Sequence, residues 1–283
     1  SDPDALIGKI APKIKVIVTG VAILAEDHQY PITSSVMQRF PNLRLIANLG
    51  VGYDNIDVSF ARQHDIEVTN TPDVLTDETA DTAMGLLLNT IREFSKAEAY
   101  LRAGHWLQKP YRLSASLRGR TMGIVGLGRI GKAVAKRAEP FGLRIVYHGR
   151  HHQTDMPYEY YPSLVDMARA VDILMIVAPG GPQTRHMINA QILQALGADG
   201  VLINIARGSL VDEEALIEAL TKRTIRAAGL DVYANEPHVP QQLLDLDHVV
   251  LLPHIGSGSQ PTRDLDRKST RLNSSHVKRS RMP

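Results

Sequence analysis

The stretch that decides the fold is "TMGIVGLGRIGKAVAKRAEPFG", residues 121–142. It begins with a short apolar run of the kind that forms a buried strand, and it ends with the apolar period of a helix. Between them, "GLGRIG" places Gly126, Gly128 and Gly131 in the spacing G-x-G-x-x-G. The first glycine permits a tight turn, the second lets backbone approach a pyrophosphate, and the third allows the helix to pack closely on the strand. In this strand-turn-helix context the motif favours dinucleotide binding over an ordinary turn.

Short β-rich runs alternate with helical patterns on both sides of this motif, which is typical of parallel sheets built from βαβ units. The later runs, from "TMGIVG" to "VVLLP", predict a six-stranded, doubly wound Rossmann sheet. The earlier runs, "IKVIVTG", "LRLIANLG" and "IEVTN", predict a smaller, flavodoxin-like α/β domain, and a long helical pattern from Thr76 to Gly104 follows them. We therefore expect an α/β protein with a substrate domain at 1–75, a dinucleotide-binding domain at 76–257 and a short remainder at 258–283.

The composition excludes several classes of protein. The sequence has no cysteine, which removes disulfides, thiolate metal sites and cysteine nucleophiles. No apolar stretch reaches the ~18 residues of a membrane span. The start "SDPDALIGKI" lacks the features of a secretory signal, so we expect a cytoplasmic protein without a membrane partner.

The end of the chain accounts for its net positive charge. Residues 267–283 hold six basic residues and no acidic ones, so the formal net charge of +2 does not describe the rest of the chain and predicts no nucleic-acid partner. This segment has no hydrophobic period, which indicates disorder. It also resembles the translation of a sequencing adapter. We therefore expect a disordered tail that is foreign to the natural protein.

The end of the strand after the glycine motif indicates which dinucleotide binds. An acidic residue there would accept hydrogen bonds from the ribose hydroxyls of NAD. The sequence instead reads "LRIVYHGRHH", with His148 near that position and Arg150 just beyond it. A guanidinium pairs with a 2′-phosphate, and the missing carboxylate removes a repulsion. NADP is therefore favoured, with NAD possible, and His148, His151 and His152 are interpreted as a basic loop rather than a metal site.

Three further segments end predicted strands of the same sheet: "INIARGSLVDEEAL", "AAGLDVYANEP" and "LLPHIGSGS". They bring Arg207, Glu236 and His254 to its carboxyl edge, where ligands of such sheets bind. Reduction of a ketone creates an alkoxide, so the site needs a proton donor and a cation that binds the substrate. Histidine suits the first role and arginine the second, while a carboxylate beside a histidine favours the protonated imidazole. Each residue alone has an ordinary structural explanation, but together they predict a catalytic set.

On these residues the chain resembles the D-isomer-specific 2-hydroxyacid dehydrogenases, nearest in style to the glyoxylate/hydroxypyruvate reductases. The resemblance implies reduction of a small 2-keto acid, with Arg207 binding the substrate, His254 as the acid and base, and Glu236 as its partner. It also implies a homodimer, with residues 94–117 as a contact region. Further implied site residues are Val51 and Gly52 for the substrate carboxylate, and Arg129, Ile130, Thr184 and Asp231 for the cofactor.

The resemblance is incomplete, and other functions stay open. The family begins with a further strand and helix and continues through a returning helix, so we expect the smaller domain to be truncated at both ends. A phosphoglycerate-type dehydrogenase and a non-catalytic, dinucleotide-sensing corepressor are the alternatives. A formate dehydrogenase is disfavoured, because it would place glutamine at the position of Glu236.

Overall fold

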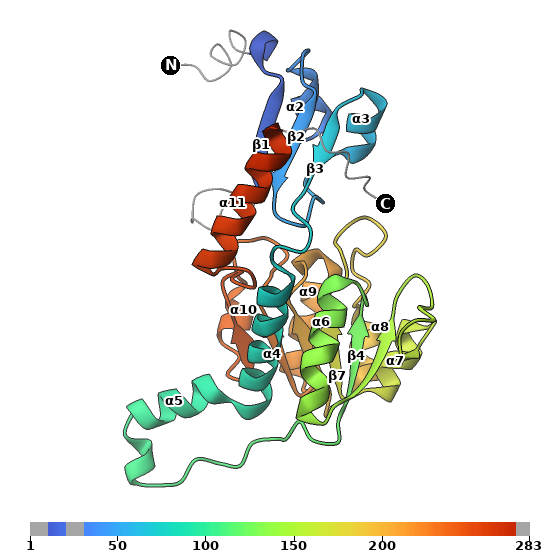
Figure 1. Ribbon diagram of the computed structural model, residues 1–283. Coiled ribbons are helices and arrows are strands. Elements are labelled where there is room, and N and C mark those ends of the chain that lie inside the picture. Colours follow the sequence, from blue (N-terminus) through green and yellow to red (C-terminus); the bar gives the residue numbers. More distant parts are fainter. Residues whose placement is uncertain (1–10, 21–30, 276–283) are drawn as a thin grey trace. The chain divides into compact units, whose positions relative to one another are not determined.

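The computed structural model describes residues 11–20 and 31–275, and the chain divides into two compact units (Figure 1). The larger unit is Thr76–Gly256, and the smaller unit joins Ser1–Leu75 to Ser257–Pro283. Both units contain parallel sheets with helices, so the predicted α/β class is confirmed. Within the described ranges, no helix combines the length and the apolar character that a bilayer crossing requires.

The sheet of the larger unit is doubly wound, as predicted. Its strand order is β10-β9-β8-β7-β4-β5-β6. The first strand of this sheet in sequence, β4, is therefore central, and the later strands lie on both sides of it. Every neighbouring pair is parallel. The strands are β4 (Thr121–Val125), β5 (Arg144–His148), β6 (Glu159–Tyr160), β7 (Ile173–Ile176), β8 (Val201–Asn204), β9 (Ala227–Leu230) and β10 (Val249–Leu251). The six predicted strands are all present, and the two-residue β6 adds a seventh at one edge.

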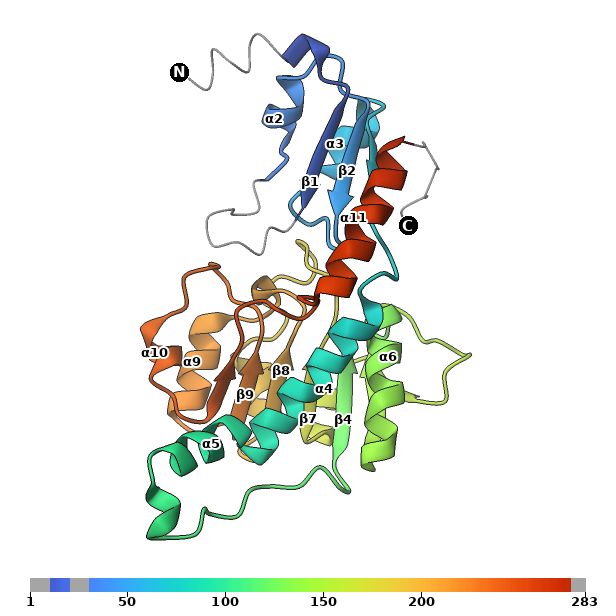
Figure 2. The ribbon, with the colours of Figure 1, turned by 60° about the vertical axis from the view of Figure 1, so that its left-hand side comes forward.

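Helices cover both faces of this sheet (Figure 2). One apolar cluster joins α4 and α6 to the sheet, and a second joins α7, α8 and α9 to the other face. In β7, Ile173 and Met175 enter the first cluster while Leu174 and Ile176 enter the second. A strand buried on both faces therefore appears in the sequence as a continuous apolar run. The helices are α4 (Thr76–Arg92), α5 (Phe94–Arg102), α6 (Arg129–Ala138), α7 (Leu164–Ala170), α8 (Ala190–Leu196), α9 (Glu213–Thr221) and α10 (Gln241–Leu244), with 3-10 turns η2 (His105–Leu107), η3 (Glu139–Phe141) and η4 (Gly208–Leu210).

The long helical pattern after Thr76 is broken at Glu93. Glu93 adopts a left-handed backbone conformation, with φ +58°, between α4 and α5. Its carboxylate accepts hydrogen bonds from the Tyr111 hydroxyl at 2.9 Å and from Arg112 at 2.6 Å. The sequence gives no sign of the break, because its stabilising partners lie 18 and 19 residues further along the chain.

The smaller unit has a three-stranded parallel sheet in the order β1-β2-β3. A separate apolar cluster around Met37, Ile46 and Ile66 forms its core. Its elements are η1 (Ala11–Lys13), β1 (Val16–Gly20), α2 (Ser34–Gln38), β2 (Leu45–Leu49), α3 (Val58–Gln63), β3 (Glu67–Thr69) and α11 (Gln260–Ser275). Helix α11 lies beside β2, although more than 200 residues separate them in sequence (Figure 2).

We expected a disordered tail from Arg267 onward, and for residues 267–275 this expectation is wrong. Helix α11 runs through this segment, and the remaining residues, 276–283, lie outside the described residues. The buried positions of α11 are Thr262, Asp266 and Thr270, and the hydroxyl of Thr71 donates a hydrogen bond to Asp266. These buried side chains recur every four residues, as on one face of a helix, but they are polar. A search for apolar periodicity therefore does not detect the helix.

Candidate active site

The glycine motif forms the turn between β4 and α6. Gly126 has φ +97°, and a Cβ there would lie 2.7 Å from the Cα of Ala178. A Cβ on Gly131 would lie 2.3 Å from the carbonyl oxygen of Gly126. Gly128 differs, because a Cβ there would meet no protein atom within 4 Å. Packing within the chain explains the first and third glycines, whereas the open space at Gly128 fits a pyrophosphate of a bound dinucleotide.

Helix α6 begins at Arg129, directly after Gly128. Arg129 and Ile130 are therefore in its first turn, where backbone N–H groups have no partner within the helix. Such a helix start attracts phosphate through these N–H groups and through the helix dipole. The turn thus has the shape and the donors that a dinucleotide requires.

The basic loop after β5 is tied to this turn. His148 ends β5, and its Nδ1 donates a hydrogen bond to the carbonyl oxygen of Tyr161 at 2.9 Å. Arg150 is exposed. The side-chain amide of Gln153 donates to the carbonyl oxygen of Leu127, inside the glycine motif, at 2.8 Å. Sequence reasoning missed Gln153, since nothing in an exposed polar loop marks the one side chain that reaches back to the turn.

Thr184 lies in the turn that follows β7, with its hydroxyl donating to the carbonyl oxygen of Pro179 at 2.9 Å. Within the described parts of the chain, no group of three or more histidine, aspartate, glutamate or cysteine side chains is placed to bind a metal ion.

Asp231 follows β9 and is buried. Its two carboxylate oxygens accept hydrogen bonds from the N–H groups of Ile255 and Gly256, each at 2.7 Å. Burial raises the pKa of Asp231, and these two hydrogen bonds and the charge of His254 act against the increase. The carboxylate thus fixes the turn at His254, whose φ of +52° is uncommon for a residue other than glycine.

Arg207 follows β8 on a loop that Asn204 holds in place. Asn204 is the last residue of β8 and is buried. Its Nδ2 donates to the carbonyl oxygen of Arg207 at 3.0 Å, and its Oδ1 accepts from the N–H of Ala206 at 3.1 Å. Sequence reasoning missed Asn204, although a polar residue at the end of an apolar strand is a signal that could have found it.

Glu236 and His254 form a hydrogen-bonded pair. Oε2 of Glu236 and Nδ1 of His254 are 2.6 Å apart. Oε1 of Glu236 accepts a hydrogen bond from the N–H of Tyr233 at 3.0 Å, so both carboxylate oxygens are engaged. The Tyr233 hydroxyl donates to the carbonyl oxygen of Leu252 at 2.9 Å, which links the glutamate loop to the segment before His254.

The surroundings of Glu236 keep it ionised. Burial alone would raise its pKa, but the hydrogen bond and positive charge of His254, the N–H of Tyr233 and the charge of Arg207 together hold the pKa below its ordinary value. The structure therefore brings the predicted Arg207, Glu236 and His254 close enough to interact electrostatically. An ionised carboxylate that is hydrogen-bonded to Nδ1 fixes the orientation of the imidazole ring.

The two remaining predicted site residues, Val51 and Gly52, belong to the smaller unit and follow β2. The side-chain amide of Asn48 donates to the carbonyl oxygens of Gly50 at 3.2 Å and Gly52 at 2.8 Å. Asn70 donates to the carbonyl oxygen of Val51 at 3.0 Å. Three successive carbonyl groups are thus held by side chains, which fixes the loop. Neither asparagine was identified from the sequence.

A histidine–carboxylate pair and an arginine, on the same sheet edge as a turn built for a dinucleotide, define a nicotinamide-dependent dehydrogenase. The comparison with known families agrees. The chain belongs to the D-isomer specific 2-hydroxyacid dehydrogenase family, because residues 84–256 match the model of its NAD binding domain.

Several reductases are similar to this chain over most of its length. The chain is 47% identical over 254 residues to the glyoxylate/hydroxypyruvate reductase A HPR2 of Arabidopsis thaliana, and the alignment covers 86% of this chain and 81% of the relative. It is 44% identical over 230 residues to the hydroxyphenylpyruvate reductase of Plectranthus scutellarioides, covering 81% and 74%. A crystal structure of the NADPH-dependent glyoxylate/hydroxypyruvate reductase of Sinorhizobium meliloti, in complex with NADP and malonate, superposes with a TM-score of 0.87 at 46% identity, covering 97% of this chain and 82% of that one.

Proposed function

We propose that this protein reduces a small 2-keto acid, glyoxylate or hydroxypyruvate, to the 2-hydroxy acid, with NADPH preferred over NADH. The observation that carries the proposal is the Glu236–His254 pair, 2.6 Å apart and within the electrostatic influence of Arg207. The names of the similar Arabidopsis and Sinorhizobium reductases support the choice of substrate, and the NADP bound to the Sinorhizobium enzyme supports the choice of cofactor.

The residues have complementary roles in this reaction. When bound, NADPH supplies the hydride that reduces the carbonyl carbon. The Arg207 guanidinium binds the substrate carboxylate and polarises the carbonyl. The resemblance to the family also assigns the backbone amides of Val51 and Gly52, in the smaller unit, to binding of the substrate carboxylate. His254 donates a proton from Nε2 to the oxygen as negative charge develops there, because Glu236 occupies Nδ1. Glu236 holds the imidazole in the orientation that this transfer needs.

The cofactor is bound along the carboxyl edge of the larger sheet. Gly128 and the first turn of α6, including Arg129 and Ile130, bind the pyrophosphate between the packing glycines Gly126 and Gly131. His148 and Arg150 bind the 2′-phosphate. Thr184 and Asp231 would hold the nicotinamide end of the cofactor, and Asp231 would accept from the carboxamide in addition to the backbone groups that it already holds.

An assay of purified protein over a panel of 2-keto acids, with NADPH and with NADH, tests the proposal. Glyoxylate, hydroxypyruvate, hydroxyphenylpyruvate and phosphohydroxypyruvate separate the substrate classes, and oxidation of 3-phosphoglycerate with NADP or NAD tests the last class in the reverse direction. Turnover of the first two with NADPH supports the proposal. Tight NADPH binding without turnover of any substrate contradicts it and favours a dinucleotide-sensing protein.

Replacement of the proposed acid gives a second, sharper prediction. His254→Ala is expected to lower kcat by about 10²–10⁴ while the Kd for NADPH stays nearly unchanged, because the imidazole acts on the substrate oxygen. Steady-state rates and fluorescence titration of NADPH measure the two quantities. A variant with unchanged kcat, under conditions where chemistry limits the rate, shows that His254 is not the acid.

A further inference from the structure

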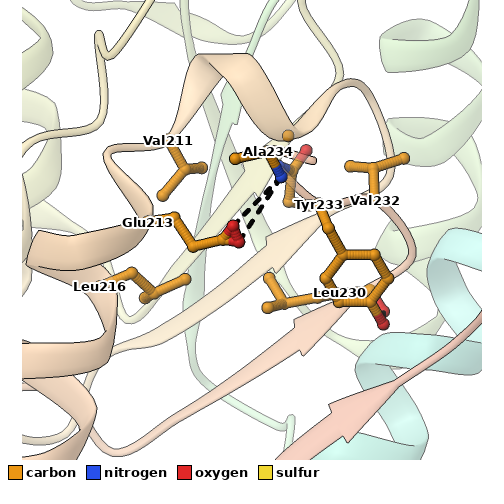
Figure 3. A pocket seen from close by; sticks show the side chains of 9 residues that line it. Val211, Glu213, Leu216, Leu230, Val232, Tyr233 and Ala234 are labelled. Atoms are coloured by element: carbon orange, nitrogen blue, oxygen red, sulfur yellow. Dashed lines mark hydrogen bonds between the residues drawn. The ribbon is translucent and has the colours of Figure 1, made fainter. Parts of the chain in front are cut away.

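Glu213 lies outside the catalytic set, yet its carboxylate is anchored to the loop that carries Glu236. It is the first residue of α9, and its two oxygens lie 3.1 and 3.5 Å from the backbone N–H of Ala234, which donates to them (Figure 3). Ala234 lies 21 residues beyond Glu213 and directly before the Asn235–Glu236 dipeptide. The contact is therefore a tertiary link between a helix and the loop of the acid–base pair.

The backbone around this contact is closely packed. A Cβ on Gly208 would lie 1.9 Å from the carbonyl carbon and oxygen of Tyr233, and 2.5 Å from the nitrogen of Ala234. The segment after Arg207 and the loop before Glu236 thus touch backbone to backbone. Tyr233 in turn donates its N–H to Oε1 of Glu236. The position of the Glu236 carboxylate therefore depends on how Tyr233 and Ala234 are held.

The place that Glu213 occupies is unfavourable for a carboxylate. Figure 3 shows it reaching toward Ala234 beside the side chains of Val211 and Leu216, in a pocket that Leu230 and Val232 also line. Burial raises the pKa of Glu213, the Ala234 hydrogen bond lowers it, and the negative charge of Glu236 raises it further.

The start of α9 does not require this particular carboxylate. An acidic residue is favourable in the first turn of a helix, because it interacts with the helix dipole. The adjacent Glu214 is also acidic and in the first turn of α9, and it is exposed. The specific contribution of Glu213 is therefore its bond to Ala234.

We propose that Glu213 is a positioning residue, which holds the Ala234 amide and thereby keeps Glu236 in place against Nδ1 of His254. The inference rests on the proposed function, because it assigns Glu213 to the same acid–base pair. Without an acceptor at this position the loop loses its attachment to α9. A displacement of about 1 Å in a catalytic group costs up to about 10²-fold in rate.

Three variants test this proposal. Glu213→Ala removes the acceptor, Glu213→Gln keeps an acceptor oxygen without the charge, and Glu214→Ala removes a charge from the same helical turn without touching the loop. We expect Glu213→Ala to lower kcat by about 10–100-fold with the Kd for NADPH unchanged. Glu213→Gln is expected to restore most of the rate, and Glu214→Ala to behave as the wild type.

A second measurement is independent of turnover. A short hydrogen bond to a carboxylate gives the Nδ1 proton of His254 a downfield NMR signal, which we expect to weaken in Glu213→Ala and to persist in Glu213→Gln and Glu214→Ala. If the wild type reduces no 2-keto acid, the proposed function fails while this signal still tests the positioning. An unchanged signal in Glu213→Ala overturns the inference. Equal losses of kcat, cofactor binding and Tm in both Glu213 variants also overturn it, because they indicate a general role in folding.

Discussion

The acid–base pair depends on charge at single residues, and Glu236→Gln separates charge from shape. The pKa of Glu236 is lowered, so its carboxylate is ionised throughout the neutral range. Glutamine keeps the hydrogen-bonding shape without the charge. We expect Glu236→Gln to lower kcat/KM, measured between pH 5 and 9, by about 10–100-fold, because it replaces a charge-assisted hydrogen bond by a neutral one.

The size of that loss decides the question. Wild-type kcat/KM in Glu236→Gln across this pH range contradicts an electrostatic role for Glu236. Asp245→Asn is a suitable control, because this exposed carboxylate lies on the surface after α10 and hydrogen-bonds Gln241. We expect it to leave the profile unchanged.

Cofactor preference is also set at single residues. Arg150→Ala is expected to weaken NADPH binding by roughly one to two decades and to leave NADH binding nearly unchanged, since a charge-assisted pair with phosphate contributes about 1.5–3 kcal/mol. Titration of both cofactors measures the change. Arg169→Ala, which removes an exposed arginine from α7, is the control. Equal affinities for the two cofactors in the wild type indicate that the basic loop does not discriminate.

At the scale of elements, the glycines in the turn between β4 and α6 have different roles, in packing or in cofactor binding. Gly131→Ala forces a Cβ to within 2.3 Å of the Gly126 carbonyl oxygen, so we expect it to lower the free energy of unfolding by about 1–3 kcal/mol. Gly128→Ala adds a Cβ that meets no protein atom within 4 Å, so we expect little loss of stability but weaker NADPH binding. Urea unfolding and NADPH titration distinguish the two. A similar loss of stability in both variants contradicts this division.

At the scale of the whole molecule, the segment around η2 exposes large apolar side chains. Trp106, Leu107 and Leu113 are 65%, 93% and 95% exposed. Single exposed apolar residues are ordinary, but three within eight residues of sequence favour an interaction site. On this exposure and on the resemblance to the family, we propose a homodimer that uses residues 94–117.

Light scattering after size-exclusion chromatography tests the dimer. The wild type is expected at twice the mass of one chain, and the double variant Leu107→Glu, Leu113→Glu at the mass of one chain. Leu244→Glu, on α10, is the control, since Leu244 is also exposed, at 54%, but lies outside the segment. A monomeric wild type, or a double variant that remains dimeric, refutes the assignment.

Sequence alone determined those features that depend on local patterns. The strands of the larger sheet are continuous apolar runs, because both faces are buried, and the glycine spacing reflects close contacts within one turn. Arg207, Glu236 and His254 were identifiable because parallel strands deliver the residues after them to one edge. Ketone reduction needs a proton donor and a cation that binds the substrate, and this requirement led to the roles predicted for these residues.

Only the tertiary structure decided the features that depend on distant partners. Gln153 and Glu213 act through hydrogen bonds to backbone groups that lie 26 and 21 residues away, and an isolated polar residue gives no sign of such a partner. The break at Glu93 depends on Tyr111 and Arg112, and α11 buries a polar face against the smaller sheet. The left-handed turn at His254 is held by Asp231, 24 residues before Ile255. In each case the stabilising free energy comes from a contact that forms only when the chain has folded.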